Sequence, residues 1–257
     1  MKGKAVRSEL DLERALAAAG LRAPVRWEEV TGSTNATAYR LAMEGAPEWT
    51  LVAAGHQTAG RGRLDRIWED VAGRSLLCSI VLRPSMRAED AGLLTLLAGA
   101  AWAEAAREVA GVTASCKWPN DLLVGEAKAG GVLTESLVAD GRVEMAILGS
   151  GINLEPPSGI DRAVAGLGRD VDPVALLGTF LSRFREGYEA PSDRFTDAAR
   201  ERWRAVSATL GREVRATRAD GVPLQGRAVD IDARGGLVLD TADGLAVVSF
   251  GEVMHLI

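Results

Sequence analysis

The chain has 257 residues, of which 47% are apolar, so it can bury a substantial core and is not a disordered protein. Its formal net charge of −5 argues against a protein held on nucleic acid by a general basic field, although local arginine clusters can still bind a phosphate. The N-terminus has no apolar segment after its charges, and the two cysteines, Cys78 and Cys116, suit a reducing compartment. We therefore expect a cytoplasmic protein with no signal peptide and no membrane contact.

Short helices and strands alternate in the first part of the chain. Ser8 and Asp11 form a capping pattern at the start of a helix that stops at Gly20. The elements expected after it are a strand at 25–30, a helix at 36–45, strands at 49–57 and 75–84, and a long helix at about 88–110. The strand at 75–84 is too apolar for burial on one side only, so we expect it in the centre of a sheet.

The second part begins with hairpins and ends in short β runs. The elements expected there are two short strands within 112–125, a hairpin at 130–154, a Pro/Gly-rich loop at 155–173, helices at 174–189 and 193–205, and β structure from Leu210 onward. Asp140-Gly141 is a strong turn signal for the hairpin. The whole pattern predicts an α+β fold with a mixed sheet flanked by helices, followed by a small β-barrel.

The segment Lys117-Trp118-Pro119-Asn120-Asp121 combines side chains that no regular core element needs. Pro119 fixes its own φ and biases Trp118 towards an extended backbone. We expect Trp118 to anchor the segment by burial, which leaves Lys117, Asn120 and Asp121 for a ligand. A strained turn without a ligand is the alternative.

A standard phosphate-binding loop is absent from the sequence. There is no G-x-x-x-x-G-K-[ST], and Asp65 and Leu154 stand where two near-matches to G-x-G-x-x-G need their last glycine. Gly60-Arg61-Gly62-Arg63 instead offers backbone amides and two guanidinium groups to an anion. A solvated basic loop explains the same residues equally well.

Three further positions have both a plain and a functional interpretation. Lys128 is either a solvated hairpin charge or a ligand for a phosphate or carboxylate that lies against Gly130 and Gly131. Ser33-Thr34-Asn35 is either a plain N-cap or the polar end wall of a pocket for a small urea- or amide-containing ligand. Gln57 would add an amide to that wall, or is simply a polar strand end.

The order of these motifs is more specific than any one of them. Ser33-Thr34-Asn35 is followed by HQTAGRGR with a later tryptophan, then KWPNDL, K-x-x-G-V-L and G-x-G-I-N-L. From about residue 26 to 155 the sequence thereby resembles the biotin protein ligases. The remainder agrees with the C-terminal SH3-like domain of that family by its size and β texture.

The resemblance implies a class II synthetase-like core of the biotin/lipoate ligase type and a C-terminal SH3-like barrel. It divides the chain into a short N-terminal helix and lead-in at 1–25, a catalytic domain that binds biotin and ATP at 26–208, and the SH3-like domain at 209–257.

The resemblance also implies a reaction in two steps. The carboxylate of biotin attacks the α-phosphate of MgATP, which gives biotinyl-5′-AMP and pyrophosphate. A lysine of a biotin carboxyl carrier domain then accepts the biotin, and AMP leaves. The expected carrier belongs to acetyl-CoA carboxylase or a related carboxylase, and Mg²⁺ is expected to arrive with ATP, without a metal site made by the protein alone. Fixed Arg and Lys donors would stabilise the charge that develops on the α-phosphoryl group.

Site residues follow from the match to the family motifs. The catalytic set is Lys128, Arg63, Arg61, Lys117 and Asp121. The biotin-binding set is Ser33, Thr34, Asn35, Gln57, Gly60, Arg61, Gly62, Arg63, Lys128, Gly130 and Gly131. The ATP and adenylate set is Arg61, Arg63, Trp68, Lys117, Asn120, Lys128 and Asn153. Core packing of Trp68 and turn capping by Asn153 are the alternatives for those two residues.

Two positions depart from the family pattern. Leu64-Asp65 stands where the family has x-Gly, and although Asp65 tolerates left-handed backbone angles, it adds a negative charge near a phosphate site. Gly32 stands where an acidic residue is frequent, and we expect little consequence. Because only about 25 residues precede the catalytic region, too few for a helix-turn-helix reader, we expect neither DNA binding nor repressor function.

Two competing functions remain open at the level of sequence. A lipoate ligase shares the adenylation chemistry, but GRGR together with KWPND favours biotin. A non-catalytic biotin or nucleotide sensor would keep the pocket, but the intact Arg61, Arg63 and Lys128 argue against it. Sequence leaves both a monomer and a homodimer open.

Overall fold

The computed structural model describes residues 6–64, 66–157, 163–218, 222–249 and 251–256. It begins with helix α1 (Glu9–Ala18), where Oγ of the N-cap Ser8 accepts a hydrogen bond of 3.2 Å from the backbone N–H of Asp11. The capping pattern in the sequence predicts this contact. No helix in the described residues is long and apolar enough to cross a membrane.

Seven strands of the described residues form one sheet in the spatial order β1-β2-β3-β7-β6-β5-β4. They are β1 (Val25–Glu28), β2 (Leu51–Ala54), β3 (Ser75–Leu82), β4 (Ala114–Lys117), β5 (Asp121–Val124), β6 (Ala127–Ala139) and β7 (Arg142–Asn153). Only β1 and β2 run parallel within this sheet of the described chain, so the predicted mixed sheet is confirmed. Strand β3 is buried at every residue, in agreement with the interior position that its apolar sequence predicts.

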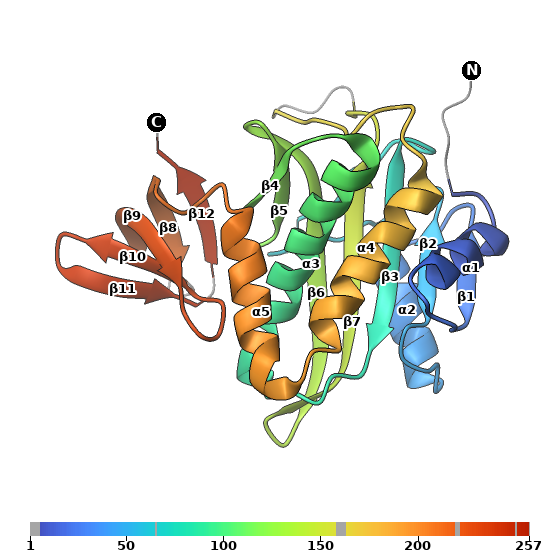
Figure 1. The fold of residues 1–257 in the computed structure, drawn as a ribbon, viewed down its shortest axis with the longest axis horizontal. Coiled ribbons are helices and arrows are strands. Elements are labelled where there is room, and N and C mark those ends of the chain that lie inside the picture. The colour runs from blue at the N-terminus through green and yellow to red at the C-terminus, as the bar shows by residue number, and fades with distance from the viewer. Residues whose placement is uncertain (1–5, 65, 158–162, 219–221, 250, 257) are drawn as a thin grey trace.

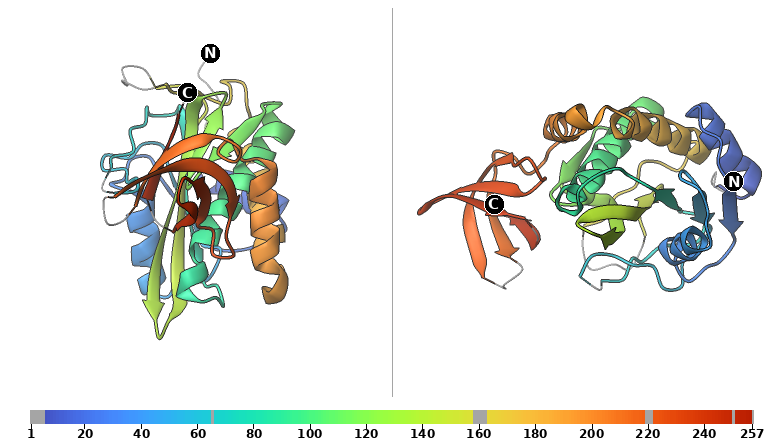
Figure 2. Two further views of the ribbon diagram at one scale, coloured as in Figure 1. Left: turned by 90° about the vertical axis from the view of Figure 1, so that its left-hand side faces the viewer. Right: turned by 90° about the horizontal axis from the view of Figure 1, so that it is seen from below.

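Helices cover both faces of this sheet (Figures 1 and 2). They are α2 (Thr34–Met43), the 3₁₀ turn η1 (Ala88–Asp90), α3 (Gly92–Ala105) with a π-helical end η2 (Ala106–Ala110), α4 (Pro173–Tyr188) and α5 (Ser192–Ala205). Helix α2 lies on one face, and α1, α3, α4 and α5 lie on the other. Alternation along β3 serves both faces, because Ile80 joins the larger core and Val81 packs with Ala38 and Ala42 of α2.

The predicted and observed element boundaries differ at several places. The strand predicted at 49–57 is regular only over β2, because the residues after Ala54 turn away to form a loop. The helix predicted at 36–45 begins two residues earlier, at Thr34. The hairpin predicted at 130–154 is confirmed, with Asp140 in a left-handed conformation (φ 48°) at its turn. Part of the loop predicted at 155–173 lies outside the described residues.

The C-terminal strands form a second sheet, entirely antiparallel, in the order β11-β10-β9-β8-β12. They are β8 (Glu213–Arg218), β9 (Pro223–Ile231), β10 (Leu237–Thr241), β11 (Gly244–Val248) and β12 (Gly251–His255). In the part of the chain that the structure describes, β11 and β12 do not pair, so the expected barrel is an open sheet. Figure 1 shows this sheet beside α5, at the end of the molecule opposite α1.

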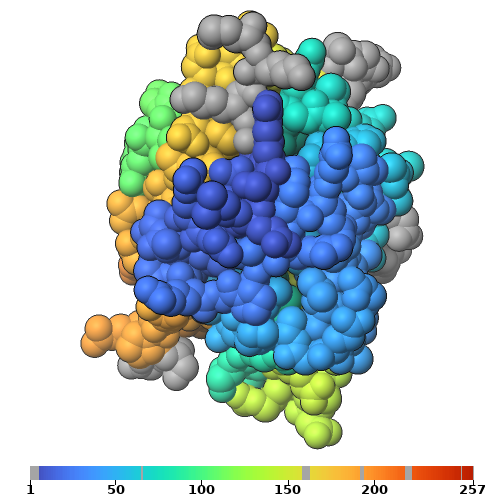
Figure 3. Space-filling view, turned by 90° about the vertical axis from the view of Figure 1, so that its right-hand side faces the viewer, coloured from blue at the N-terminus to red at the C-terminus, as the bar shows by residue number. Residues whose placement is uncertain are grey.

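Backbone contacts beside β4 hold the segment that leads from α5 into the second sheet. The N–H of Cys116 donates to the carbonyl of Val206 (2.7 Å), and the N–H of Ala208 donates to the carbonyl of Cys116 (2.8 Å). Far from this junction, α1, β1 and α2 gather on one surface of the molecule, which Figure 3 shows in blue. The C-terminal sheet therefore lies where it can contribute residues to a site near β4 and β5.

Candidate active site

One cavity brings together most of the residues that the sequence motifs predict. The predicted residues that line it are Ser33, Thr34, Asn35, Gln57, Arg61, Gly62, Arg63, Trp68, Lys117, Asn120, Asp121, Lys128 and Gly131. They come from the start of α2, the loop after β2, the β4–β5 turn and strand β6. Predicted residues up to 98 positions apart in the sequence, Ser33 and Gly131, thus surround one space.

The floor of the cavity is made by glycines of two paired strands. Gly131 of β6 lies opposite Gly151 of β7, and both lie beneath the ring of Trp68. A Cβ atom on Gly151 would come within 2.5 Å of Cε2 of Trp68, closer than real contacts allow. Bare backbone at this position therefore lets the indole lie directly on the sheet. The Nε1 atom of Trp68 is buried and has no hydrogen-bond partner among the described residues.

The polar end of the cavity is built around the first turn of α2. Oε1 of Gln57 accepts hydrogen bonds from the backbone N–H (2.8 Å) and the hydroxyl (3.1 Å) of Thr34. The hydroxyl of Ser79 lies 2.6 Å from Oδ1 of Asn35 and 2.8 Å from Oγ1 of Thr34. Ser33 is the N-cap residue, but its side chain makes no capping hydrogen bond in the described structure. Ser33 lines the cavity, which leaves its side chain available for a ligand.

The cationic end of the cavity is held by ion pairs. Nζ of Lys128 lies 2.5 Å from Oδ1 of Asp121, and both side chains are about a quarter exposed. Nη2 of Arg61 donates to Oε2 of Glu135 at 2.9 Å, and Nδ2 of Asn35 donates to the same oxygen at 2.6 Å. Glu135 therefore ties the loop after β2 to the start of α2.

Arg63 lies at the boundary between the cavity and the C-terminal sheet. Burial lowers the pKa of its guanidinium, and the charges of Glu252 and Asp121 oppose that effect. Glu252 of β12 also pairs with Arg66, and Glu252 and Val253 both line the cavity. The smaller sheet thus supplies part of the cavity wall.

The segment 117–121 is anchored as its sequence predicts. Trp118 is 3% exposed, its backbone N–H donates to Oγ1 of Thr209 (3.0 Å), and its Nε1 donates to the carbonyl of Gly235 (2.9 Å). The Trp118–Pro119 peptide bond is cis. Nδ2 of Asn120 donates to the carbonyl of Val132 (3.0 Å), so this amide also holds the segment to β6. The polar members of the segment consequently face the cavity from a fixed backbone.

Three predicted site residues do not line the cavity. Asn153 is buried, where its Nδ2 donates to the carbonyl of Ala165 (3.2 Å), so its amide holds a loop. A Cβ atom on Gly60 would meet the carbonyl oxygen of Trp68, and one on Gly130 would meet the side chain of Ile152. These glycines serve close packing behind the wall. Asp65, whose charge the sequence makes a concern, lies outside the described residues.

Sequence reasoning missed Gly149, Gly151 and Glu252 in the cavity lining, and Glu135, which contacts the lining residues Arg61 and Asn35. Alternation along β6 places Glu135 on the same face as Gly131, so its pattern contained a usable signal. No sequence pattern indicates Glu252, because only the packing of the second sheet brings it near the cavity. Within the described residues, no group of three or more His, Cys, Asp or Glu side chains gathers as a metal site.

Comparisons with known proteins agree with this geometry. Residues 27–153 match the family model described as "Biotin/lipoate A/B protein ligase family", and residues 209–256 match "Biotin protein ligase C terminal domain". The "Bifunctional ligase/repressor BirA" of Bacillus subtilis is 32% identical over 236 residues, which are 88% of this chain and 72% of that protein. The "Biotin--[acetyl-CoA-carboxylase] ligase" of Mycobacterium tuberculosis is 34% identical over 240 residues, 88% of this chain and 86% of that protein.

A solved structure is similar over nearly the same extent. It is the biotin protein ligase from Aquifex aeolicus in complex with biotin and ATP, with a TM-score of 0.71 and 27% identity. The match covers 91% of this chain and 98% of the other.

Proposed function

Because the chain belongs to the biotin protein ligase family, we propose that it joins biotin to a lysine of a biotin carboxyl carrier domain in two steps. MgATP first converts biotin to biotinyl-5′-AMP with release of pyrophosphate. The carrier lysine then attacks the mixed anhydride, an amide forms, and AMP leaves. The observation that carries this proposal is one cavity with a hydrogen-bonding end at α2 and basic side chains, Lys117 and Lys128, at the other end.

The two ends suit the two ends of biotin. The ureido ring needs hydrogen-bond donors and acceptors, which the groups of Ser33, Thr34, Asn35 and Gln57 provide. The carboxylate then points towards Lys128. The C-terminal match to a biotin protein ligase domain supports biotin over lipoate as the substrate.

The first step concentrates negative charge on the α-phosphoryl oxygens. Lys128, Arg61 and Arg63 would stabilise that charge, since all three line the cavity. Lys128 contacts Asp121, Arg61 contacts Glu135, and the charge of Glu252 acts on Arg63, so the cationic groups are held before the reaction and the cost of reorganising them is lower. The carboxylate oxygen of biotin forms the new bond to phosphorus, and pyrophosphate takes the electron pair of the bond that breaks.

The nucleotide is assigned to the side of the cavity formed by Trp68, Lys117 and Asn120. Trp68 offers a broad apolar surface for the adenine, and Lys117 a charge for the phosphates. The cavity lining contains two carboxylates, Asp121 and Glu252, and each contacts a basic side chain. This supports Mg²⁺ entering as MgATP. The geometry does not favour a nucleotide contact for Asn153.

The second step needs a base or an anion near the acceptor amine. Asp121 is the assigned residue, because its carboxylate lies at the cavity beside Lys128. When Lys128 engages the adenylate, Asp121 can receive the incoming ammonium and orient it after proton loss. The acceptor is proposed to be the carrier domain of acetyl-CoA carboxylase or a related carboxylase, in keeping with the name of the mycobacterial relative.

The proposal includes a division of labour along the chain. Residues 1–25 form the lead-in, 26–208 the catalytic domain and 209–257 an SH3-like domain. We expect the protein to act in the cytoplasm, without binding a DNA operator.

One assay tests the main claim. The protein is incubated with ATP, Mg²⁺, biotin and a carrier domain, and the carrier is weighed by mass spectrometry. A biotinyl mass increment is expected, and lipoate in place of biotin should give none. Labelling with lipoate alone would identify a lipoate ligase, and biotin binding without any labelling would identify a sensor.

A further inference from the structure

Asp70 is a buried carboxylate that the proposed reaction does not use. Its side chain is 0% exposed. Its Oδ2 lies 2.9 Å from Nδ1 of His56, and its Oδ1 accepts a hydrogen bond of 3.2 Å from the backbone N–H of Gln57. Both partners come from consecutive residues just after β2, at the edge of the cavity.

The chain between Gln57 and Asp70 covers the cavity. We name its described part, residues 58–64 and 66–69, the arch. The arch carries Arg61, Arg63 and Trp68 of the cavity lining. Asp70 follows the arch and contacts the two residues that precede it, so it closes the arch at its base.

Contacts with other elements also hold the arch: the N–H groups of Thr58 and Ala59 donate to the carbonyls of Thr31 (2.9 Å) and Gly32 (2.8 Å), and ion pairs join Arg61 to Glu135 and Arg66 to Glu252. Within it, the N–H of Trp68 donates to the carbonyl of Gly60 (2.9 Å), and the N–H of Gly62 donates to the carbonyl of Arg66 (2.7 Å). The exposed side chains of Leu64 and Ile67 contribute little burial. Among these contacts, those of Asp70 are the ones in which a fully buried side chain joins the two ends of the arch.

Because the Asp70 carboxylate is buried, its contacts with His56 and Gln57 favour the closed base of the arch. A buried anion is stable only while hydrogen-bond donors surround it. His56, in a form that carries a proton on Nδ1, and the amide of Gln57 supply such donors. Separation of the two ends of the arch would remove both donors from a carboxylate that has no exposure to water. The buried charge consequently favours the closed base.

Gln57 transmits this effect to the polar end of the cavity. Asp70 fixes its backbone, and its side-chain oxygen accepts two hydrogen bonds from Thr34. The amide is thus located by an anchor at each end. A shift of the backbone at Gln57 would move the amide away from Thr34 and out of position for a bound ring.

We propose that Asp70, together with His56, is a positioning residue that closes the base of the arch and holds Gln57 in register with α2. Asp70 contacts no substrate itself. Its effect on biotin rests on the proposed function, whereas its effect on the order of the arch does not.

The kinetic test compares Asp70→Ala with Asp70→Asn. Asp70→Ala removes both contacts and is expected to raise KM for biotin about tenfold while kcat changes less than about twofold, because binding is lost equally from ground and transition states. Asp70→Asn keeps an acceptor for the amide of Gln57 and should recover part of the loss. Asp243→Ala, in an exposed turn of the C-terminal sheet, is the matched control and should leave KM unchanged. An unchanged KM in Asp70→Ala would contradict the inference.

Hydrogen exchange on the ligand-free protein gives an independent readout. The amides of Gly62 and Trp68 should exchange several-fold faster in Asp70→Ala than in the wild type, while amides of β3 keep their rates. If Asp70→Ala does not fold, Asp70→Asn and His56→Ala carry the comparison. Uniformly faster exchange would assign Asp70 a merely structural role and overturn the proposal.

The two readouts separate the two hypotheses. Faster exchange in the arch of a protein that labels no carrier would refute the ligase function and leave the role of Asp70 at the arch standing. Full ligase activity together with unchanged exchange in Asp70→Ala would support the ligase function and refute the role of Asp70 at the arch.

Discussion

Lys128 and Asp121 approach to 2.5 Å at the cavity, and their side chains are only about a quarter exposed. Partial burial makes such a pair stronger than the exposed ion pairs of the helices, whose contribution is about 0–1 kcal/mol. The ammonium is therefore fixed in place, yet its partner is a side chain that a more highly charged phosphate can replace. Arg61, in the loop after β2, forms a second ion pair at the cavity, with Glu135.

We predict that Lys128→Gln slows adenylate formation by at least about 10²-fold, because one fixed charge aimed at the transition state is lost. Biotin-dependent release of pyrophosphate measures the rate. Arg40→Gln, on the exposed surface of α2, is the control and should retain wild-type activity. Wild-type rates in Lys128→Gln would rule out the role assigned to this lysine.

Glu135 holds Arg61 and Asn35 through one oxygen atom, so its removal releases both. We predict that Glu135→Ala raises KM for biotin about tenfold, which corresponds to the loss of roughly 1.4 kcal/mol of binding. Glu135→Gln should fall between the variant and the wild type. Glu144→Ala, an exposed acid on the adjacent strand, is the matched control. Equal KM values in Glu135→Ala and Glu144→Ala would show that the shared contact is dispensable.

At the scale of elements, the hairpin of β6 and β7 determines the shape of the site. Glycines at 131, 149 and 151 leave a strip of bare backbone on the face that α2 shares. A side chain at Gly149 would collide with Asn35, and one at Gly151 with Trp68. The strip lets the start of α2 and the indole rest on the sheet.

We predict that Gly151→Ala displaces Trp68 and raises KM for ATP several-fold, because the new methyl group occupies the position of the indole. Tryptophan fluorescence should differ between Gly151→Ala and the wild type. The same comparison in a Trp68→Phe background should show no such difference, because the indole at position 68 is then absent. Gly32→Ala is the control, since a Cβ atom there meets nothing within 4 Å. Unchanged fluorescence would mean that the indole tolerates the methyl group.

Elements of this kind could be predicted from sequence to different degrees. The strands and the hairpin follow from local alternation and from the Asp-Gly turn, and the motifs placed most of the cavity residues correctly in one group. The contact between Arg66 and Glu252 joins residues 186 positions apart and depends on how the second sheet packs, so no local pattern announces it. Asn153 belongs to a family motif, but its side-chain amide hydrogen-bonds to the loop carbonyl of Ala165, which the motif does not indicate.

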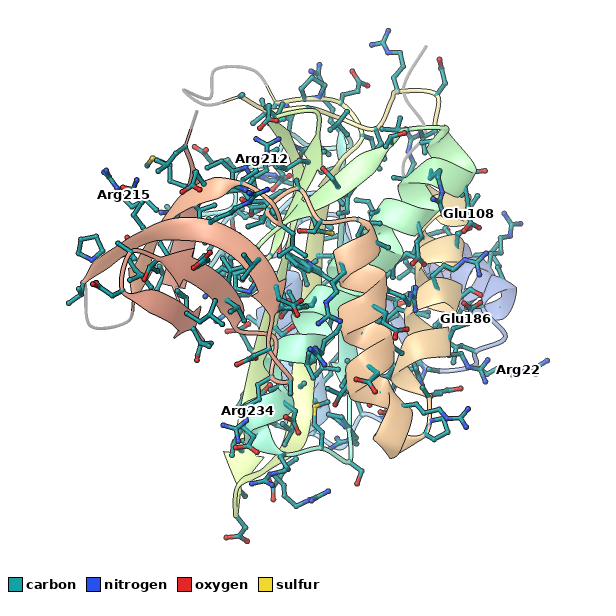
Figure 4. The ribbon with its side chains drawn as sticks, turned by 60° about the vertical axis from the view of Figure 1, so that its left-hand side comes forward. Arg22, Glu108, Glu186, Arg212, Arg215 and Arg234 are labelled. Carbon is teal, nitrogen blue, oxygen red and sulfur yellow. The ribbon has the colours of Figure 1, made fainter. Side chains whose placement is uncertain are left out.

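At the scale of the whole molecule, the smaller sheet acts as a support for the larger one. Trp118 reaches the carbonyl of Gly235, and its backbone binds Thr209, whose hydroxyl lies 3.1 Å from Nε2 of His255. Figure 4 shows Arg212 near the junction of the two sheets, and Arg215 and Arg234 on other parts of the same side of the molecule. On the opposite side lie Glu108 of η2 and Glu186 of α4, both labelled in Figure 4, and each pairs with Arg183 of α4.

The stability of this junction should depend on pH through His255. Burial, with the charges of Lys117 and Arg212, lowers the pKa of His255 from 6.5 to about 4. Between these values the unfolded chain binds a proton that the folded chain does not, so the free energy of unfolding falls as the pH falls from 6.5 towards 4. Because the imidazole is partly exposed, solvent screening limits the loss to about 1 kcal/mol.

Chemical denaturation at pH 7 and at pH 4.5 measures this loss. We predict that His255→Gln, which can still form a hydrogen bond with Thr209, shows a smaller fall in unfolding free energy than the wild type. Parallel pH dependences in the two proteins would assign the sensitivity to other groups.

The strand order of the large sheet also bears on how the chain is made. Strand β3 is buried at every residue and mostly apolar, and β7, its neighbour on one side, begins 60 residues after β3 ends. During synthesis a chain that has not yet reached residue 153 carries β3 with an unpaired edge, which is a template for aggregation. The long separation also slows folding, because a large loop must close before the pair forms. Nascent chains that stop at the β6–β7 turn should therefore depend on chaperones, whereas chains that include β7 should not.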